Sequence, residues 1–375
     1  MQFILIKIGG GAMIYRDTYT VINVDRLIEN VEYLYQHVKK DIMAVVKADA
    51  YGCGYKEVSK ALHELPFIKV FAVATLKEAI KLRAVGITKD ILVLGAIVKN
   101  VEDIKLAIEY DISLTVFSLE YARHLASSKA FDEKLKVHVK IDTGMNRIGL
   151  KTKQQYLEVI DLLKQTNFQI EGVFTHFACA DESYQLYQQQ KERFYEIIGN
   201  DQYRYIHCEN SAAMLYHQDN DSNLCRAGIA MYGVDPAGNE SQKLKQVLFL
   251  YTKVAMVKKV SQGEKIGYGY TYELPHDGYV ATLPIGYGDG FIRQNQGRNV
   301  YINGQFFPIV GRVCMDQMMV LVDETIKVDD TVEIFGDHIT LAMMAKELNT
   351  IPYEVMCLIS KRVERVYQGK KKLSI

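Results

Sequence analysis

Eight short apolar runs, rich in β-branched residues, recur along the first part of this 375-residue chain. Longer segments with helical spacing of apolar residues separate them, as at 101–110 and 183–198. The runs read IMAVVK (42–47), VFAVA (70–74), ILVLG (91–95), SLTVF (113–117), KVHVKID (136–142), IEGVFTH (170–176), RYIHC (204–208) and LCRAG (224–228). Apolar strands that alternate with helices are typical of a parallel sheet. Eight such units predict a (β/α)8 TIM barrel, with a doubly wound sheet as the alternative.

After Tyr232 the apolar pattern changes to a period of two residues. A polar stretch at 235–246 is expected to be a linker, and short strands broken by Gly and Asn turns follow it, with one helix over 341–348. The apolar run at 3–8 is too short for a membrane span and is a candidate edge strand of the second domain. We therefore expect an α/β protein with an N-terminal extension (1–16), a (β/α)8 barrel (17–240) and a mainly β C-terminal domain (241–375).

The charge balance and the cysteines exclude several classes of function. Lys plus Arg number 45 and Asp plus Glu number 45, so the formal net charge is zero. No global basic field therefore draws the chain onto nucleic acid or an anionic membrane. The six cysteines contain no CxxC pair, which argues against a zinc ribbon or a dense disulfide framework and fits reduced thiols in the cytoplasm. The expected partner is a small molecule.

The polar residues that close each apolar run are the first functional candidates, because the active site of a parallel barrel forms at the carboxyl ends of its strands. Lys47 closes the first run and precedes a Gly-containing turn that allows close approach of the backbone to a ligand. Lys140 ends the fifth run, and Arg147 lies in the loop behind it. Each of these side chains, taken alone, is more commonly a solvated surface residue than a functional one.

The later runs supply further candidates. His176 ends the sixth run, where a lone histidine is more often hydrogen-bonded scaffolding than a catalyst. Ser211 and Arg226 belong to the last two units, where barrel loops commonly form a phosphate site, and Gly228 and Ile229 would offer backbone N–H groups there. The sequence has no HxH motif or clustered carboxylates, so we expect no metal site. A lysine, two arginines and a phosphate cradle together predict a phosphorylated cofactor.

Eight motifs, in order along the chain, carry a resemblance to a known family. They are AVVKADAYGCG (44–54), KIDTGMNRIG (140–149), GVFTHFACADE (172–182), ENSAA (209–213), RAGIAMYGVDP (226–236), GEKIGYGYTY (263–272), PIGYGDG (284–290) and GRVCMDQ (311–317). In these motifs the chain resembles the alanine racemases. The resemblance implies a cytoplasmic pyridoxal 5′-phosphate enzyme that interconverts L-alanine and D-alanine and supplies D-alanine for bacterial peptidoglycan. It also implies a head-to-tail homodimer whose sites each borrow residues from the partner.

The resemblance also assigns roles to individual residues. It implies that Lys47 is the Schiff-base lysine and one base, and that Tyr268 is the second base, presented by the partner subunit. By similarity, the other cofactor-binding residues are Tyr51, His176, Ser211, Arg226, Gly228, Ile229 and, at the C-terminal position, Lys361. The substrate-side residues would be Arg147, Tyr287 and Met315, supported by Cys314, Asp316 and Lys140, the last of which matches a lysine that is carbamylated in many members.

Two bases of different kinds suit a racemisation, because one proton must leave one face of the substrate and another must arrive on the opposite face. A tyrosine has an ordinary pKa of about 10, so a nearby cation or a hydrogen-bonded His–Arg pair is needed to lower it. His176 and Arg226 are the candidates for that pair. An arginine against the pyridine nitrogen keeps that nitrogen unprotonated, which disfavours side reactions such as transamination.

One position departs from the family pattern. Members usually read Ser-Tyr-Arg near the C-terminus, with the tyrosine on the cofactor phosphate, whereas this chain has Ser360, Lys361 and Arg362. A lysine meets a phosphate as a flexible point charge, so the alternative function is a racemase with a broader or different preference, such as serine. A barrel protein that carries the cofactor without turnover is disfavoured by the β domain. An amino-acid decarboxylase is disfavoured by Arg226, since an acid is expected at that position.

Overall fold

An eight-stranded parallel sheet closes into a barrel in the computed structural model, which describes residues 16–96, 101–127, 134–217, 221–238 and 243–369. The strand order is β8-β7-β6-β5-β4-β3-β2-β9. The strands are β2 (Asp41–Val45), β3 (Ile68–Val73), β4 (Asp90–Val93), β5 (Ile112–Val116), β6 (Lys136–Lys140), β7 (Gln169–Phe174), β8 (Tyr205–His207) and β9 (Leu224–Ala227). The ring closes where Asn223 N donates to Ile206 O and Arg226 N donates to Glu209 O, both at 3.0 Å. The predicted TIM barrel and its eight strands are confirmed.

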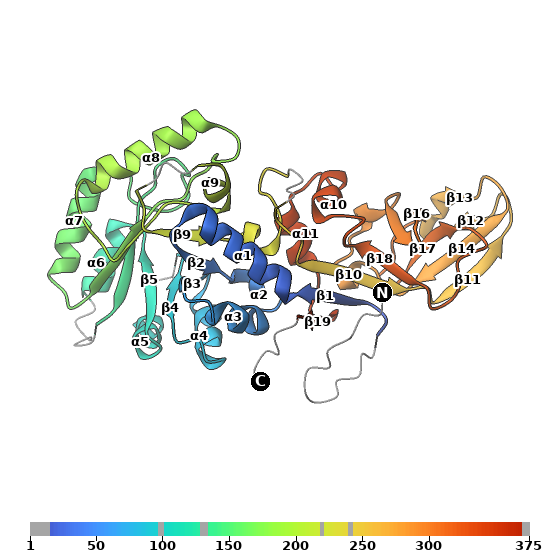
Figure 1. Cartoon of the computed structure of the whole chain (residues 1–375), viewed down its shortest axis with the longest axis horizontal. Helices are drawn as coiled ribbons and strands as arrows, with labels where there is room; N and C mark the ends of the chain where they lie inside the picture. Colours follow the sequence, from blue (N-terminus) through green and yellow to red (C-terminus); the bar gives the residue numbers. More distant parts are fainter. Residues whose placement is uncertain (1–15, 97–100, 128–133, 218–220, 239–242, 370–375) are drawn as a thin grey trace.

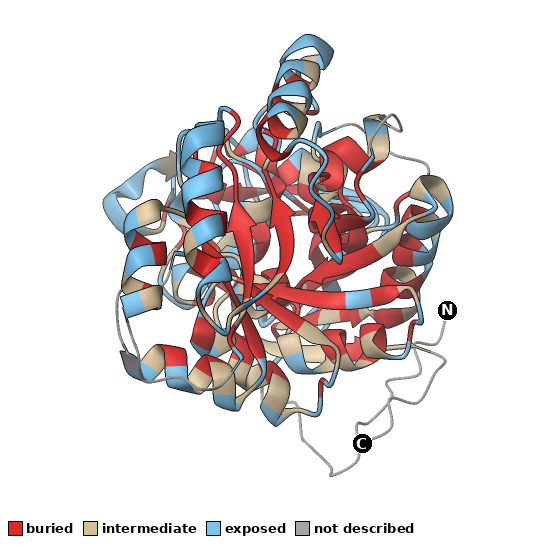
Figure 2. Cartoon of the chain, turned by 90° about the vertical axis from the view of Figure 1, so that its left-hand side faces the viewer, coloured by how far each residue is buried: buried red, intermediate tan, exposed pale blue. Residues whose placement is uncertain are grey.

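Helices cover the outside of the barrel, so that the strands are buried and the outer helix faces are exposed (Figure 2). Capping side chains fix several helix starts: Thr75 accepts from Glu78 N, and Asn210 accepts from Ala213 N. The helices expected at 101–110 and 183–198 are confirmed as α5 and α8. The helical elements are α1 (Val24–Val38), α2 (Lys47–Tyr51), α3 (Tyr55–His63), α4 (Leu76–Ala84), α5 (Val101–Glu109), α6 (Leu119–Ser127), α7 (Lys153–Lys164), α8 (Tyr184–Ile198), α9 (Ser211–Tyr216) and the 3₁₀ helix η1 (Ile229–Tyr232).

A nine-stranded sheet forms a second lobe, which lies beside the barrel along the long axis of the molecule (Figure 1). Its strand order is β11-β14-β17-β16-β15-β18-β10-β1-β19. The strands are β1 (Tyr19–Asn23), β10 (Leu248–Lys253), β11 (Met256–Val260), β14 (Gly278–Leu283), β15 (Asn299–Ile302), β16 (Gln305–Val310), β17 (Met318–Val322), β18 (Thr331–Phe335) and β19 (Glu364–Gln368). This lobe also contains the short pair β12 (Lys265–Ile266) and β13 (Tyr272–Glu273), the helices α10 (Leu341–Glu347) and α11 (Pro352–Leu358), and the 3₁₀ turns η2 (Tyr268–Tyr270), η3 (Tyr287–Asp289) and η4 (Arg293–Asn295). The predicted mainly β C-terminal domain is confirmed.

The strand β1 joins the second sheet although it precedes the barrel in the chain. It pairs antiparallel with β10 and parallel with β19, so that Tyr19 lies opposite both Tyr251 and Glu364. We expected 17–240 to belong to the barrel, whereas the sheet pairing places Tyr19–Asn23 in the other lobe. Pairing between segments far apart in sequence leaves no trace in local periodicity, which explains the difference. The candidate edge strand at 3–8 lies outside the described residues.

Candidate functional site

A left-handed turn directly after β2 sets the position of Lys47 at the carboxyl end of the barrel. The four residues after Lys47 all have φ between 51° and 57°, and Gly52 follows at φ 80°. A left-handed conformation costs a residue with a Cβ roughly 1–2 kcal/mol, so the surrounding contacts must hold this turn. Glu78 supplies such contacts, because its Oε1 accepts from Ala48 N at 2.7 Å and its Oε2 accepts from Ala74 N at 2.9 Å. The backbone around Lys47 is therefore fixed before any ligand binds.

Three of the predicted residues converge into a small polar cradle. The Ser211 Oγ accepts from Gly228 N at 3.0 Å and from Ala230 N at 3.3 Å, at the start of η1. A Cβ added to Gly228 would lie 3.1 Å from the Tyr51 hydroxyl and 3.5 Å from the Ser211 Oγ. Glycine at 228 therefore leaves room between two hydroxyls, and the buried Ile229 begins the 3₁₀ turn beside it. Backbone N–H groups and hydroxyls in this arrangement suit a phosphate.

The guanidinium of Arg226 is buried and held in one orientation. Its Nη2 donates to Thr175 O at 2.8 Å and to Cys208 O at 2.9 Å. The same nitrogen lies 3.4 Å from His176 Nδ1. Burial and the charge of Arg226 lower the pKa of His176 well below its usual value, so this imidazole is neutral at neutral pH. The predicted His176–Arg226 pair therefore exists, and it consists of a neutral ring beside a fixed cation.

His207, a further partner of Arg226, was not among the predicted site residues. Its Nδ1 lies 3.0 Å from Arg226 Nη1, and its Nε2 lies 3.0 Å from His138 Nδ1. Burial, together with Arg226, lowers the pKa of His207 well below its usual value, so it can accept from the guanidinium. The available signal was the apolar run RYIHC, in which a histidine occupies a buried strand position. A polar residue inside an apolar strand points to a partner in the barrel interior.

Two lysines and a second arginine make the mouth of the barrel strongly cationic. Burial and the charge of Arg226, against an opposing effect of Asp142, lower the pKa of Lys140 to about 7. The Lys140 ammonium donates to Ile141 O at 3.2 Å. Burial and the charge of Arg147 also lower the pKa of Lys47. Both amines therefore lose their protons more readily than solvated lysines do, which is the property that a base or a nucleophile requires.

The other predicted site residues lie on the second lobe. Tyr268 is 71% exposed in η2, and Met315 is 53% exposed in the turn before β17. In the described chain, a pocket of about 540 Å³ is lined only by second-lobe residues, which are Tyr268, Tyr287, Ile292, Arg293, Arg312, Val313 and Cys314. The chain therefore carries two separate groups of site residues. Arg293 and Arg312 were not among the predicted site residues, although Arg312 lies inside the GRVCMDQ motif.

A buried carboxylate joins the turns around the second group. Asp289 accepts from Gly286 N at 2.9 Å, from Arg362 Nε at 2.6 Å and from both terminal nitrogens of Arg16. Arg362 also donates to Asp316 at 2.6 Å. Hydrogen bonds from Arg16, Arg362 and Gly286 lower the pKa of Asp289 despite its burial. Asp289 thus connects the Tyr287 turn, the turn before β17 and the C-terminal segment, a role that only its contacts reveal.

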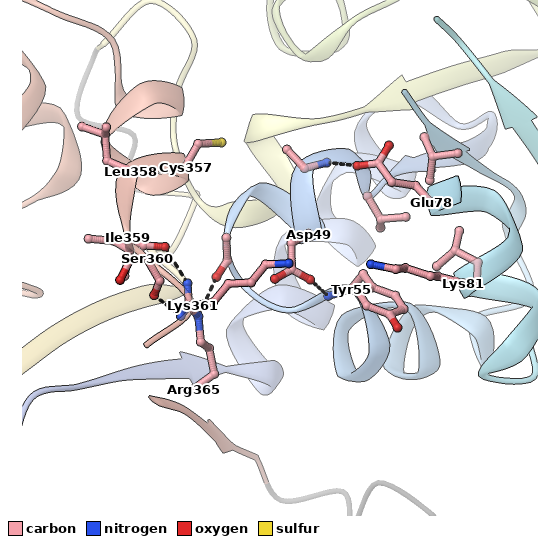
Figure 3. A pocket seen from close by; sticks show the side chains of 15 residues that line it. Asp49, Tyr55, Glu78, Lys81, Cys357, Leu358, Ile359, Ser360, Lys361 and Arg365 are labelled. Carbon is pink, nitrogen blue, oxygen red and sulfur yellow. Dashed lines mark hydrogen bonds between the residues drawn. The ribbon is translucent and has the colours of Figure 1, made fainter. Parts of the chain in front are cut away.

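Lys361 lies in the wall of a different pocket (Figure 3), which Val46 and Ala48, the residues on either side of Lys47 in the chain, also line. The residues that line this pocket of about 370 Å³ include Lys361 and Ala48 but none of Tyr51, Ser211 or Gly228.

Among the described residues no group of three or more His, Cys, Asp or Glu is arranged to hold a metal ion. Within the same residues, no helix combines the length and apolarity that a membrane crossing needs.

Comparisons with known proteins agree across both lobes. Residues 22–236 match the family model described as alanine racemase, N-terminal domain, and residues 247–367 match alanine racemase, C-terminal domain. An alanine racemase of Streptococcus pyogenes serotype M12 is 39% identical over 365 residues, which cover 94% of this chain and 99% of that protein. The crystal structure of alanine racemase from E. faecalis superposes with a TM-score of 0.90 at 38% identity, covering 96% of this chain and 100% of that one. A histidine racemase from Leuconostoc mesenteroides superposes with a TM-score of 0.87 at 27% identity, covering 96% and 100%.

Proposed function

The chain belongs to the alanine racemase family, an isomerase family that interconverts L- and D-alanine, and we propose that it acts with pyridoxal 5′-phosphate held at the mouth of the barrel. One observation carries this proposal. The Ser211–Gly228–Tyr51 cradle, the fixed Arg226 guanidinium and the strained turn of Lys47 lie around the same carboxyl end of the barrel. They offer a phosphate site, a ring-nitrogen partner and an amine, which are the three contacts that this cofactor needs.

The residues of the barrel fit the cofactor in chemistry as well as in placement. The phosphate would meet Tyr51, Ser211 and the N–H groups of Gly228 and Ile229. Arg226 would face the pyridine nitrogen, where a guanidinium cannot give up a proton and so leaves the ring nitrogen unprotonated. When bound, the cofactor supplies an electron-withdrawing ring that acidifies the α-proton of the attached amino acid.

The proton transfers fall to Lys47 and Tyr268. The lowered pKa of Lys47 increases its neutral fraction, so that it can remove or return a proton on one face of the substrate. Tyr268 would serve the opposite face, and Arg147 and Met315 would orient the substrate carboxylate. His176 is neutral and lies beside the Arg226 cation, so the pair can hold a tyrosinate by charge and hydrogen bonding.

We further propose that Tyr268 comes from a second copy of the chain, in a homodimer. Tyr268, Tyr270, Tyr287 and Met315 are large apolar residues that stay exposed on the second lobe. An exposed group of this kind marks an interaction surface. The two groups of site residues on one chain would then complete two sites by exchange between identical subunits.

The cofactor proposal is tested on purified protein by its visible absorption band and by borohydride reduction. Reduction should add the cofactor mass to the peptide that contains Lys47. Gly228→Ala, which places a methyl group between the two cradle hydroxyls, should weaken cofactor binding roughly tenfold. Gly278→Ala is the matched control, because a Cβ there meets only ordinary contacts with Leu321 and Leu274. Labelling of a different lysine, or equal cofactor affinity in both variants, would contradict the proposal.

Lys361, in place of the tyrosine that is usual in the family, favours the use of a second substrate besides alanine. Its exposed, flexible side chain stands where family members usually have a tyrosine, which leaves more room for a hydroxymethyl side chain. We therefore propose that L-serine is used better, relative to L-alanine, than in a Lys361→Tyr variant. The ratio of kcat/KM for the two amino acids measures this, and an equal ratio in both proteins would show that Lys361 has no bearing on specificity.

A further inference from the structure

The pocket beside Lys47 has walls from both lobes of the molecule (Figure 3). The left-handed turn and α4 form one side, and the residues 357–361 with Arg365 form the other. Its volume is about 370 Å³. The described residues of the phosphate cradle take no part in lining it, so a ligand in this pocket would not compete for the same contacts as the cofactor phosphate.

The two acidic side chains in the walls already have partners. Both oxygens of Glu78 accept backbone N–H groups, since Oε1 binds Ala48 N and Oε2 binds Ala74 N and Thr75 N. Asp49 Oδ1 accepts from Tyr55 N at 3.0 Å. These carboxylates therefore serve the strained turn and the start of α3, and their capacity to hold a ligand cation is largely used.

The basic side chains in the pocket walls, unlike the acidic ones, do not all have hydrogen-bond partners. The Arg365 guanidinium donates to four backbone carbonyls, at Gly52, Ile359, Ser360 and Val363. In the described chain, the ammonium groups of Lys81 and Lys361 make neither an ion pair nor a hydrogen bond. Lys81 Nζ lies 5.7 Å from the centre of the Tyr55 ring.

Figure 3 shows Lys81 and Lys361 approaching the pocket from opposite walls. Within the described residues, the Ser360 hydroxyl is buried and has no hydrogen-bond partner. With three basic and two acidic side chains in its walls, the pocket carries a net positive charge. The uncommitted groups that face the pocket are thus two ammonium donors, which suit oxyanions.

We propose that this pocket binds a small dianion, a phosphate or a dicarboxylate, between Lys81 and Lys361, as a ligand site separate from the substrate and cofactor sites. Charge-assisted hydrogen bonds from the two ammonium groups would hold the ligand oxygens. The proposal goes beyond the racemase activity and gives Lys361 a role in this pocket in addition to its proposed effect on substrate preference. It places the ligand next to Lys47, because the wall residues Val46 and Ala48 flank Lys47 in the chain.

Calorimetric titration of the cofactor-saturated enzyme tests this proposal. Inorganic phosphate and succinate are the two probes, and sodium chloride at matched ionic strength is the blank. We expect one saturable site per chain for at least one probe, and the comparison of the two shows which dianion the pocket prefers. Lys81→Gln and Lys361→Gln should each weaken binding roughly tenfold, since each removes one charged donor. Lys77→Gln, on the exposed face of the same helix α4, should leave the titration unchanged.

Three results would overturn the proposal. The first is no saturable heat with either probe, and the second is binding that neither lysine variant changes. The third is a Lys361→Gln protein that loses cofactor, seen in its visible absorption, while its phosphate titration stays the same, because Lys361 would then serve the cofactor alone. The titration needs no turnover, so a failure of the proposed catalytic mechanism would appear separately, in the racemase assay and the cofactor spectrum.

Discussion

The two groups of site residues in this chain differ in how completely the fold of one subunit fixes them. On the barrel, Arg226 is 3% exposed and is held by carbonyls and imidazoles on several strands. On the second lobe, Tyr268 is 71% exposed in a short 3₁₀ turn. The barrel group therefore has its electrostatic environment before any partner binds, whereas Tyr268 still faces solvent.

The difference indicates that assembly of the active site is completed at Tyr268, not at the barrel. Preorganised, desolvated charges are strong in catalysis, and the barrel provides them within one chain. A tyrosine in water is a poor base, so Tyr268 needs the cationic environment of a barrel mouth.

Replacing Lys47 should remove the function of the barrel group entirely. In Lys47→Ala we expect racemisation in both directions to fall by at least about 10³-fold, because covalent attachment and one base are lost together. The measurement is the initial rate from L-alanine and from D-alanine. Lys77→Ala, an exposed lysine, is the control and should behave as wild type. Substantial racemisation by Lys47→Ala, or a borohydride-reducible cofactor linkage on another lysine, would contradict this role.

Replacing Tyr268 should separate activity from stability. Tyr268→Phe should lower the rate by about 10²–10⁴-fold, the range for loss of a general acid or base. Its free energy of unfolding should change by less than about 0.5 kcal/mol, because the side chain is mostly exposed. Tyr270→Phe, two residues away and equally exposed, is the matched control and should keep its activity. Equal loss in both variants would mean that the turn, rather than the Tyr268 hydroxyl, matters.

Replacing Asp289 tests whether its hydrogen bonds hold the turns of the second lobe in position. Asp289→Asn removes the buried negative charge that Arg16 and Arg362 share, which should lower the free energy of unfolding by about 1–3 kcal/mol, since both arginines are partly exposed. It should also raise KM, because the Tyr287 turn loses its anchor. Urea unfolding and steady-state kinetics measure the two effects. Asp329→Asn, at an exposed turn position, serves as the control. An unchanged KM would show that the turn keeps its position without Asp289.

The smallest expected effect concerns the pH dependence of stability at Lys140. Its pKa is about 7 in the folded chain, against an ordinary value near 10.5, so between these values only the unfolded chain binds this proton. The free energy of unfolding should therefore rise with pH across this window, by up to about 1.4 kcal/mol per pH unit from this group. Lys140→Met should lack that slope. Urea unfolding of both proteins in CO₂-free buffer between pH 7.5 and 9.5 measures it, and equal slopes would contradict the assignment.

The barrel was predictable from sequence because its signals are local. Each strand is a short apolar run, and the functional side chains follow the ends of those runs, as Lys47 and Lys140 do. Parallel topology then brings strand ends together at one edge. This is why residues such as Arg226 and His176 could be placed in one pocket without coordinates.

The contacts missed from sequence are those that join distant segments. The pairing of β1 with β10 and β19, the contact of His207 with Arg226 and the bridge from Asp289 to Arg16 and Arg362 each connect residues of different periodic segments. Local spacing carries no information about such contacts. The left-handed turn at 48–51 was also missed, because alanine, aspartate and tyrosine do not favour positive φ.

The most direct test of the shared site is a mixture of two inactive proteins. If Tyr268 acts across the interface, a mixed dimer of Lys47→Ala and Tyr268→Phe subunits contains one site with both changes and one site with neither. Equal mixing followed by subunit exchange should then restore about a quarter of the wild-type activity. If Tyr268 served its own chain, every site would carry one change. Mixed dimers that are verified by mass spectrometry but stay inactive would contradict the account.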